Sequence, residues 1–263
     1  MRADKYFAEK FGSRTKSAEA IEKGLVLVDG KKIRPKDEVK GTEEISFVDA
    51  EESFVSNGGY KLSRAIKTFS FDCMDKVFAD IGASTGGFSD CLLQNGAKKI
   101  YAVDVGESLL HEKISGDDRI IKMENTNARY LTKSDFSEPI DGVVIDVSFI
   151  SLKLILPAIK EILKADGDGL LLIKPQFECE NKNIGKSGIV HPSSHAKIVK
   201  NIVDFCLEIG LYPIEIVNAP IRKGKNIEYV LHVKPAKTGA VSAVTIENSV
   251  KEFVKLNSLE QLK

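Results

Sequence analysis

The chain is poor in residues that bind metals or form disulfides, and it has no long apolar run. Its four cysteines, Cys73, Cys91, Cys179 and Cys206, are scattered without close pairs, and its four histidines give no zinc-ligand spacing with them. No stretch approaches the roughly 18 apolar residues of a membrane span. The charged first residues lead into no apolar signal core. These absences predict a cytoplasmic protein without a metal and without membrane contact.

The net charge is zero, but the charge is unevenly distributed. Residues 1–40 hold eleven Lys or Arg against seven Asp or Glu, a net charge of +4, so residues 41–263 carry −4. A small basic region joined to an acidic body indicates that a polyanion contacts the N-terminal part of the chain. A chance distribution of solvated surface charges explains the same numbers equally well.

Residues 1–52 are predicted to form a small α+β unit. Arg2 to Phe11 favours one short helix, and Ser13 is a suitable cap for a second helix that ends at Lys23 before Gly24. A strand over 25–28, a tight turn at Asp29-Gly30 and a strand over 44–47 follow. A polar connector over 53–59 then ends in two glycines.

Residues 60–235 are predicted to form an α/β unit, because apolar strands alternate with amphipathic helices. This alternation predicts a mostly parallel sheet with helices on both faces. Residues 236–263 are predicted to be a linker and a polar helix. The expected strands span 76–81, 99–103, 119–122, 142–145, 169–173, 212–218 and 227–233, and the expected helices span 60–69, 88–95, 152–163 and 193–209.

Ligands of such sheets bind beyond the carboxyl ends of the strands, so the residues that follow each strand are the candidate site. The first strand leads into a D-x-G-x-x-x-G-G turn, which differs from the dinucleotide fingerprint and is typical of S-adenosylmethionine sites. Its glycines let the backbone approach a ligand closely, although a plain strand-to-helix turn needs only one glycine. Asp104, after the second strand, is placed to accept both hydroxyls of a ribose. The turn residues with this expected role are Asp80, Gly82, Ser84, Gly86 and Gly87.

Two lysines and two carboxylates are expected at the same rim. Asp146 and Lys174 each follow an apolar strand, Glu228 lies in the last strand region, and Lys61 lies in the helix that enters the unit. A lysine directly after a buried strand is unfavourable unless it is paired or used. One interpretation is a plain ion-pair cluster. The other is catalytic: a buried lysine beside a second ammonium can take the proton of a ribose hydroxyl, and the carboxylates hold both lysines in place.

Residues 76–235 resemble the FtsJ-like ribose 2′-O-methyltransferases, which share a Lys–Asp–Lys–Glu tetrad that matches Lys61, Asp146, Lys174 and Glu228. Residues 1–50 resemble an S4 RNA-binding domain. The two together are similar to the TlyA (hemolysin A) family. The motifs that carry this resemblance are Arg2-x-Asp4-Lys5, Ser13-Arg14, Val28-Asp29-Gly30, Gly58-Gly59-x-Lys61-Leu62 and Lys174-Pro-Gln-Phe-Glu178.

The resemblance implies a Rossmann-like methyltransferase fold after an S4-like domain, and S-adenosylmethionine-dependent methylation of a cytidine 2′-hydroxyl in ribosomal RNA within ribosomal subunits. It carries the donor site over to the turn residues, Asp104 and Asp146. Asn127 is expected either to meet the adenine or to be a loop-turn residue.

Cations in two regions are the candidate RNA contacts. In the N-terminal unit the expected phosphate contacts are Arg2, Lys5, Arg14 and Lys16; the alternative is that Arg2 and Lys5 pair with Asp4 and Glu9. In the loops at the strand ends, the cations either guide RNA to the site or are ordinary solvated charges; they are Lys182, Lys186, Arg222, Lys223 and Lys225.

Two other functions compete with methyl transfer. One is a catalytically inert RNA-binding or ribosome-assembly protein that only keeps the fold, which the presence of all four tetrad residue types disfavours. The other is the membrane-active hemolysin that the family label suggests. Against it, the expected C-terminal helix over 248–262 has only a modest apolar stripe.

Overall fold

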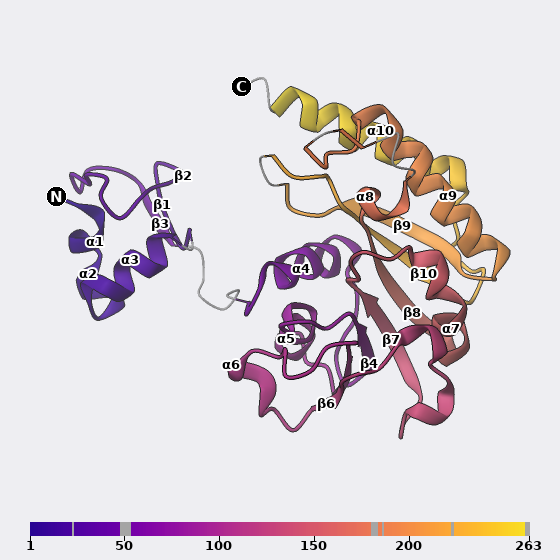
Figure 1. The fold of residues 1–263 in the computed structure, drawn as a ribbon. Coiled ribbons are helices and arrows are strands. Elements are labelled where there is room, and N and C mark those ends of the chain that lie inside the picture. The colour runs from indigo at the N-terminus through magenta and orange to yellow at the C-terminus, as the bar shows by residue number, and fades with distance from the viewer. Residues whose placement is uncertain (23, 48–53, 180–183, 186, 222–223, 261–263) are drawn as a thin grey trace. The chain divides into compact units, whose positions relative to one another are not determined.

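The structure is a computed structural model that describes residues 1–22, 24–47, 54–179, 184–185, 187–221 and 224–260. The chain divides into two compact units, Met1–Ser53 and Phe54–Lys263, and each is described by itself (Figure 1). No helix within the described ranges is both long enough and apolar enough to cross a bilayer.

The N-terminal unit packs three short helices on a small antiparallel sheet with the strand order β2-β1-β3. Ala3, Phe7, Ile21 and Val26 are buried between the two layers. The burial of these few apolar side chains from α1, α3 and β1 and from the segment before α2 stabilises this unit. The elements are α1 (Ala3–Tyr6), α2 (Ala8–Phe11), α3 (Arg14–Glu22), β1 (Val26–Val28), β2 (Lys31–Lys32) and β3 (Ile45–Phe47).

The predicted single helix over 2–11 is wrong, because the chain breaks at Phe7 into α1 and α2. Apolar spacing alone does not distinguish one helix from two successive turns that bury the same face. The next helix does begin at the expected cap, since Ser13 Oγ accepts a hydrogen bond from the Lys16 amide at 3.2 Å. Its expected last residue, Lys23, lies outside the described residues.

The C-terminal unit is built on a seven-stranded sheet with the order β6-β5-β4-β7-β8-β10-β9. All neighbouring strands are parallel except at β10, which is antiparallel to β8 and to β9. The predicted α/β class with a mostly parallel sheet is therefore confirmed. The strands are β4 (Val77–Ile81), β5 (Lys99–Val103), β6 (Ile120–Met123), β7 (Ile140–Ile145), β8 (Leu163–Ile173), β9 (Tyr212–Asn218) and β10 (Tyr229–Lys234).

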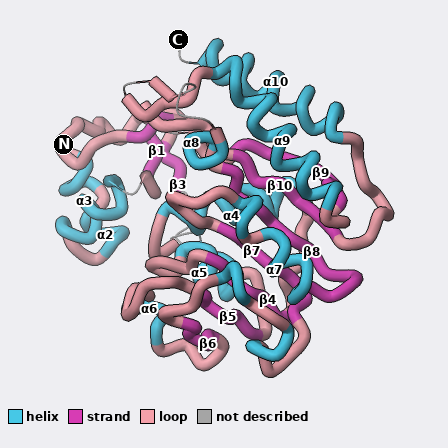
Figure 2. Tube along the Cα trace, turned by 45° about the vertical axis from the view of Figure 1, so that its right-hand side comes forward, coloured by secondary structure: helices cyan, strands magenta, loops and turns pink. Residues whose placement is uncertain are grey.

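Helices cover both faces of this sheet (Figure 2). Successive strand residues point to opposite faces, so Ala79 and Ile81 pack with α7, α9 and α10, whereas Phe78 packs with α4 and α5. The same alternation recurs along β8, so the central strands of the sheet are buried on both sides. The helices are α4 (Asn57–Phe69), α5 (Gly87–Gln94), α6 (Glu112–Ser115), α7 (Leu156–Ile162), α8 (Pro175–Glu178), α9 (His195–Glu208) and α10 (Ala243–Glu260).

The predicted helix over 152–163 is also divided, into a 3₁₀ turn over Leu152–Leu154 and α7. Pro157 stands in the first turn of α7, where a residue without an amide hydrogen is tolerated and starts a helix rather than continuing one. The strand that follows is longer than expected, because β8 begins at Leu163 directly after α7.

The antiparallel strand β10 brings a further residue to the functional rim. Tyr229, the first residue of β10, lies opposite Ile173 at the end of β8 and opposite Asn218 at the end of β9. Glu228, one residue earlier, therefore lies at the carboxyl edge of the parallel strands. A parallel strand in the same place would have put that residue at the opposite edge.

Candidate functional site

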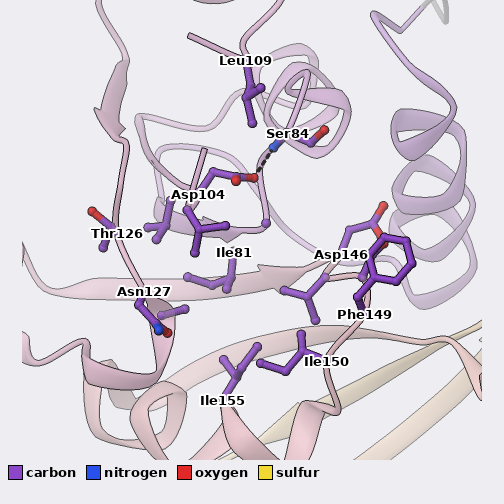
Figure 3. A pocket seen from close by; sticks show the side chains of 16 residues that line it. Ile81, Ser84, Asp104, Leu109, Thr126, Asn127, Asp146, Phe149, Ile150 and Ile155 are labelled. Carbon is purple, nitrogen blue, oxygen red and sulfur yellow. Dashed lines mark hydrogen bonds between the residues drawn. The ribbon is translucent and has the colours of Figure 1, made fainter. Parts of the chain in front are cut away.

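A cavity of about 410 Å³ opens beyond the carboxyl ends of β4, β5 and β7. We call it the donor pocket. Its volume lies within the range of roughly 300–1,000 Å³ that is typical of small-molecule sites. Figure 3 shows Asp104 and Asn127 on one side of it and Asp146 and Phe149 on the other. Further apolar side chains that line the pocket are Ile81, Val103, Val105, Leu109, Val147, Ile150 and Ile155.

The glycines of the turn after β4 are required by close contacts within the chain. Gly82 has φ +79°, and a Cβ there would lie 2.9 Å from the Asp146 carbonyl oxygen. A Cβ at Gly86 would lie 2.3 Å from Ile114, and one at Gly87 would lie 2.1 Å from Ser56. Gly82 lines the donor pocket, whereas Gly86 and Gly87 let α6 and the start of α4 pack against the turn.

Asp80 lies beneath the turn and does not line the donor pocket. Its side chain is fully buried and accepts a 2.6 Å hydrogen bond from Ser89 Oγ. Burial raises the pKa of Asp80 to about 7, and the negative charges of Asp146 and Asp104 add to this effect, while the Ser89 hydrogen bonds oppose it. The structure thus gives Asp80 a place under the turn rather than beside a ligand.

Two backbone amides hold the Asp104 side chain at the carboxyl end of β5. Oδ2 accepts from the Ser84 amide at 2.8 Å, and Oδ1 accepts from the Gly106 amide at 2.9 Å (Figure 3). Each carboxylate oxygen keeps a further lone pair, which is what two vicinal hydroxyls would need. Ser84 has φ +48°, so the turn presents its amide to Asp104 from a left-handed conformation.

Asn127 has the expected loop-turn role and also lies at the donor pocket. Its side-chain oxygen accepts from the Arg129 amide at 3.1 Å and so caps the short 3₁₀ turn over Ala128–Tyr130. The same residue lines the donor pocket beside Thr126.

The four predicted tetrad residues meet at one edge of the donor pocket. Lys61 Nζ lies 2.6 Å from Glu228 Oε2 and 3.8 Å from Asp146 Oδ2. Lys174 Nζ lies 2.6 Å from Asp146 Oδ1. Their side chains are 9–18% exposed, so the cluster is mostly shielded from water yet open on one side. The ammonium and carboxylate groups alternate, so each charge faces at least one opposite charge.

Lys174 is also tied to the loop that follows β7. Its Nζ donates to Ser148 Oγ at 2.8 Å. Four residues later, Glu178 accepts from Ser151 Oγ at 2.6 Å and from the Leu152 amide at 2.8 Å. Two cross-links therefore hold the loop after β8 against the loop after β7. Burial raises the pKa of Glu178 above its ordinary value, although the two hydrogen bonds oppose this effect.

The candidate RNA-binding cations of the N-terminal unit form two groups. Arg2 and Arg14 both donate to the buried carboxylate of Asp4, at 2.9 Å and 3.1 Å. The hydrogen bond from Arg2 outweighs the burial of Asp4, and with Arg14 it lowers the pKa of Asp4 to about 2. Both arginine side chains remain more than half exposed. Lys5 and Lys16 are exposed, and no ion pair joins Lys5 to Glu9 in the part of the unit that is described.

The loop cations at the strand ends are mostly beyond the described residues. This applies to Lys182, Lys186, Arg222 and Lys223. Lys225 is described and exposed, and it lines a second cavity next to Lys61. Within the described ranges no group of three or more His, Cys, Asp or Glu is placed to hold a metal ion.

Comparison with known proteins identifies the family. The model of the FtsJ-like methyltransferases matches residues 54–234, and the S4 domain model matches residues 1–45. The 16S/23S rRNA (cytidine-2′-O)-methyltransferase TlyA of Mycobacterium tuberculosis is 36% identical over 242 residues, which are 90% of each chain. The chain belongs to the TlyA (hemolysin A) family of FtsJ-like methyltransferases. The expected family resemblance is thereby confirmed.

Two further relatives agree with this family. YqxC of Bacillus subtilis, named as a candidate rRNA methyltransferase, is 41% identical over 225 residues, which cover 84% of this chain and 80% of YqxC. A solved structure of a candidate hemolysin from Streptococcus thermophilus is 36% identical, covers 98% of each chain and superposes with a TM-score of 0.71. This TlyA-family chain thus shares its two-domain arrangement along the sequence with a solved structure.

Several residues at the site were not expected to be there. Ser56 and Gly58, assigned to the connector, line a small cavity of about 150 Å³ beside the glycine turn, together with Lys174 and Asp146. Glu178 ends the Lys174-Pro-Gln-Phe-Glu178 motif and Ser148 follows Asp146 by two residues, but neither was assigned a role. Sequence spacing carries no signal for such contacts, because each joins segments that are separated by many residues.

Proposed function

We propose that this protein transfers a methyl group from S-adenosylmethionine to a ribose 2′-hydroxyl, of cytidine, in ribosomal RNA. The observation that carries the proposal is the alternating cluster of Lys61, Glu228, Asp146 and Lys174 at the edge of the donor pocket. Such a cluster serves a reaction in which a weak oxygen nucleophile must be oriented and then lose its proton. The names of the relatives support the choice of RNA and of cytidine.

The donor pocket suits the proposed donor. Asp104 would hold the ribose hydroxyls of S-adenosylmethionine, and the apolar walls near Asn127 would hold the adenine. The carboxylate of Asp146 lies in the same wall, so a sulfonium group there would meet a negative charge. When bound, the donor supplies an electrophilic methyl group on its sulfur.

The tetrad would do its chemistry through position. Lys174 and Lys61 would hydrogen-bond the acceptor oxygen and align it with the methyl group, which supplies much of the rate. As the oxygen–methyl bond forms and the sulfur–methyl bond breaks, the hydroxyl proton passes to Lys174 Nζ, which must first have released a proton to solvent. Asp146, 2.6 Å from Lys174 Nζ, stabilises the ammonium that results. The products are the 2′-O-methyl ribose and S-adenosylhomocysteine.

The N-terminal unit would supply RNA affinity. Lys5 and Lys16 are exposed, and Arg2 and Arg14 are held in fixed positions by Asp4 while each keeps donors toward solvent. Fixed guanidinium groups suit phosphate oxygens, which position a protein on RNA without reading its sequence. The partner would be rRNA within ribosomal subunits, and the location would then be the cytoplasm.

The proposal is tested by incubating the purified protein with methyl-tritiated S-adenosylmethionine and ribosomal subunits from a strain that lacks it. We expect label in rRNA at a single 2′-O-methylated cytidine, found by primer-extension mapping at low nucleotide concentration. The Lys174→Ala variant is the matched control and should bind the donor but leave the RNA unlabelled. Tight RNA binding with no label would favour an inert RNA-binding protein instead.

A further inference from the structure

A second cavity lies on the far side of the tetrad from the donor pocket. We call it the acceptor pocket. It has a volume of about 280 Å³, close to the lower limit of sites that hold small ligands. Its lining is largely polar. It comes from Lys61 and Glu228, from Gln176 of α8, and from the loop residues 187–189, Pro220 and 224–226.

The tetrad separates the two cavities. Asp146 lines the donor pocket, and Lys61 and Glu228 line the acceptor pocket. Lys61 joins the two sides, because its Nζ is 2.6 Å from Glu228 and 3.8 Å from Asp146. The acceptor pocket is also larger than the cavity of about 150 Å³ beside Lys174 and Asp146, so it offers more room for the rest of a nucleotide whose hydroxyl is held at the tetrad.

Two primary amides line the acceptor pocket, and they differ in what they bind. Asn226 is engaged at both ends of its amide: its Oδ1 accepts from the Val190 amide at 2.8 Å, and its Nδ2 donates to the Gly188 carbonyl at 3.0 Å. These bonds hold the loop over 187–190 as a wall of the pocket. Gln176 Oε1, in contrast, is buried and accepts no hydrogen bond within the described structure. A buried acceptor without a donor is unfavourable, so rotation of this amide toward a ligand that supplies a donor would relieve that cost.

We propose that the acceptor pocket receives the base of the nucleotide to be methylated and that Gln176 reads the edge of that base. This inference rests on the proposed function. Cytosine presents an exocyclic amino donor next to a ring-nitrogen acceptor, and a primary amide complements both groups at once. A cavity of this size admits one base rather than a base pair, so the nucleotide enters extruded from its neighbours. Gln176 is thus the residue that couples base identity to the position of the ribose.

The test measures nucleotide binding to the full-length protein saturated with S-adenosylhomocysteine, which fills the donor pocket. Calorimetry compares cytidine 5′-monophosphate with pyrimidin-2-one riboside 5′-monophosphate, which lacks the exocyclic amino group. We expect wild type to prefer the cytidine nucleotide by about 10-fold, within the range for loss of part of an amide–base pair. In Gln176→Leu that preference should vanish, and the affinity for the analogue should fall less than that for the cytidine nucleotide, because the analogue loses only the bond to its ring nitrogen.

Lys225→Ala is the matched control in the same cavity. A cation acts on the phosphate and not on the base edge, so its loss should weaken both nucleotides equally and leave their ratio unchanged. The proposal is overturned when Gln176→Leu, with wild-type circular dichroism, keeps the wild-type preference, or when wild type shows none. Methyl label in rRNA without a Gln176-dependent preference for the cytidine nucleotide would refute only the base pocket. That preference without methyl label would refute methyl transfer but not the base pocket.

Discussion

Replacing Asp80 by Asn is expected to stabilise the C-terminal unit at neutral pH and above. Asp80 is fully buried, and burial raises its pKa from 3.8 to about 7. Asn has the shape of the protonated acid, carries no charge, and keeps an oxygen that can accept from Ser89 Oγ. The substitution therefore removes only the ionisation of the buried group.

The pH dependence of the stability follows from the linkage between proton binding and folding. The pKa is higher in the folded state than in the unfolded state, so the contribution of Asp80 to stability is present below pH 3.8 and is lost as pH rises toward about 7. The loss is at most about 1.4 kcal/mol per pH unit, and it slows as the folded-state group begins to ionise near pH 7, so it amounts to roughly 2 kcal/mol from pH 5 to pH 7. Wild type should thus lose roughly 2 kcal/mol more than Asp80→Asn over this interval.

The assay is urea unfolding at pH 5, 6, 7 and 8, followed by circular dichroism because the chain has no Trp. Asp141→Asn is the control. Burial alone would raise the pKa of Asp141, but Lys164 and the Val77 amide together lower it, so this carboxylate stays ionised across the range. Its removal should shift stability equally at every pH. Parallel curves for wild type and Asp80→Asn would show that Asp80 is not protonated in the folded protein, against the reasoning above.

Four further outcomes are expected. Lys174→Ala should lower methyl transfer to rRNA at least about 100-fold while calorimetry shows unchanged donor affinity; weakened donor binding would instead assign Lys174 to the donor site. Asp104→Ala should raise the donor dissociation constant about 10- to 100-fold, since bonds to a carboxylate are lost, and unaltered binding would place the ribose elsewhere. Glu178→Ala should lower kcat about 10-fold, whereas Glu178→Gln, which keeps one acceptor for the Leu152 amide and a donor for Ser151, should restore it; equal loss in both variants would mean that the charge itself matters. Lys5→Ala with Lys16→Ala should reduce the slope of log Kd for rRNA against log salt by about 1–2, and an unchanged slope would exclude phosphate contacts there.

The rim of the sheet could be predicted from the sequence because strand ends carry a strong pattern. Asp104, Asp146 and Lys174 each follow an apolar run, and parallel strands must end at one edge. Glu228 was expected there from its place in the last strand region. The geometric reason is the antiparallel direction of β10, which no periodicity reveals. The break in the helix over 152–163 was signalled only by Pro157, within an otherwise continuous apolar pattern.

The contacts between distant segments could not be predicted. A side chain at Gly87 would collide with Ser56, and nothing in the sequence indicates that these two residues are in contact. The burial of Asp80 beneath the turn, away from the donor pocket, likewise depends on the packing of α5. Asn226 is hydrogen-bonded at both Oδ1 and Nδ2, whereas Gln176 Oε1 has no partner within the described structure. This difference depends on how the loops fold and is not visible in the sequence.

The ammonium group of Lys61 touches a carboxylate on each side of the wall between the two cavities. A ligand that binds on one side would immobilise this side chain. The second ligand would then bind without the cost in conformational entropy of ordering Lys61. The two binding equilibria are then coupled, and each ligand changes the affinity for the other by the same factor. Product left in the first cavity should therefore raise the affinity of the second cavity for RNA.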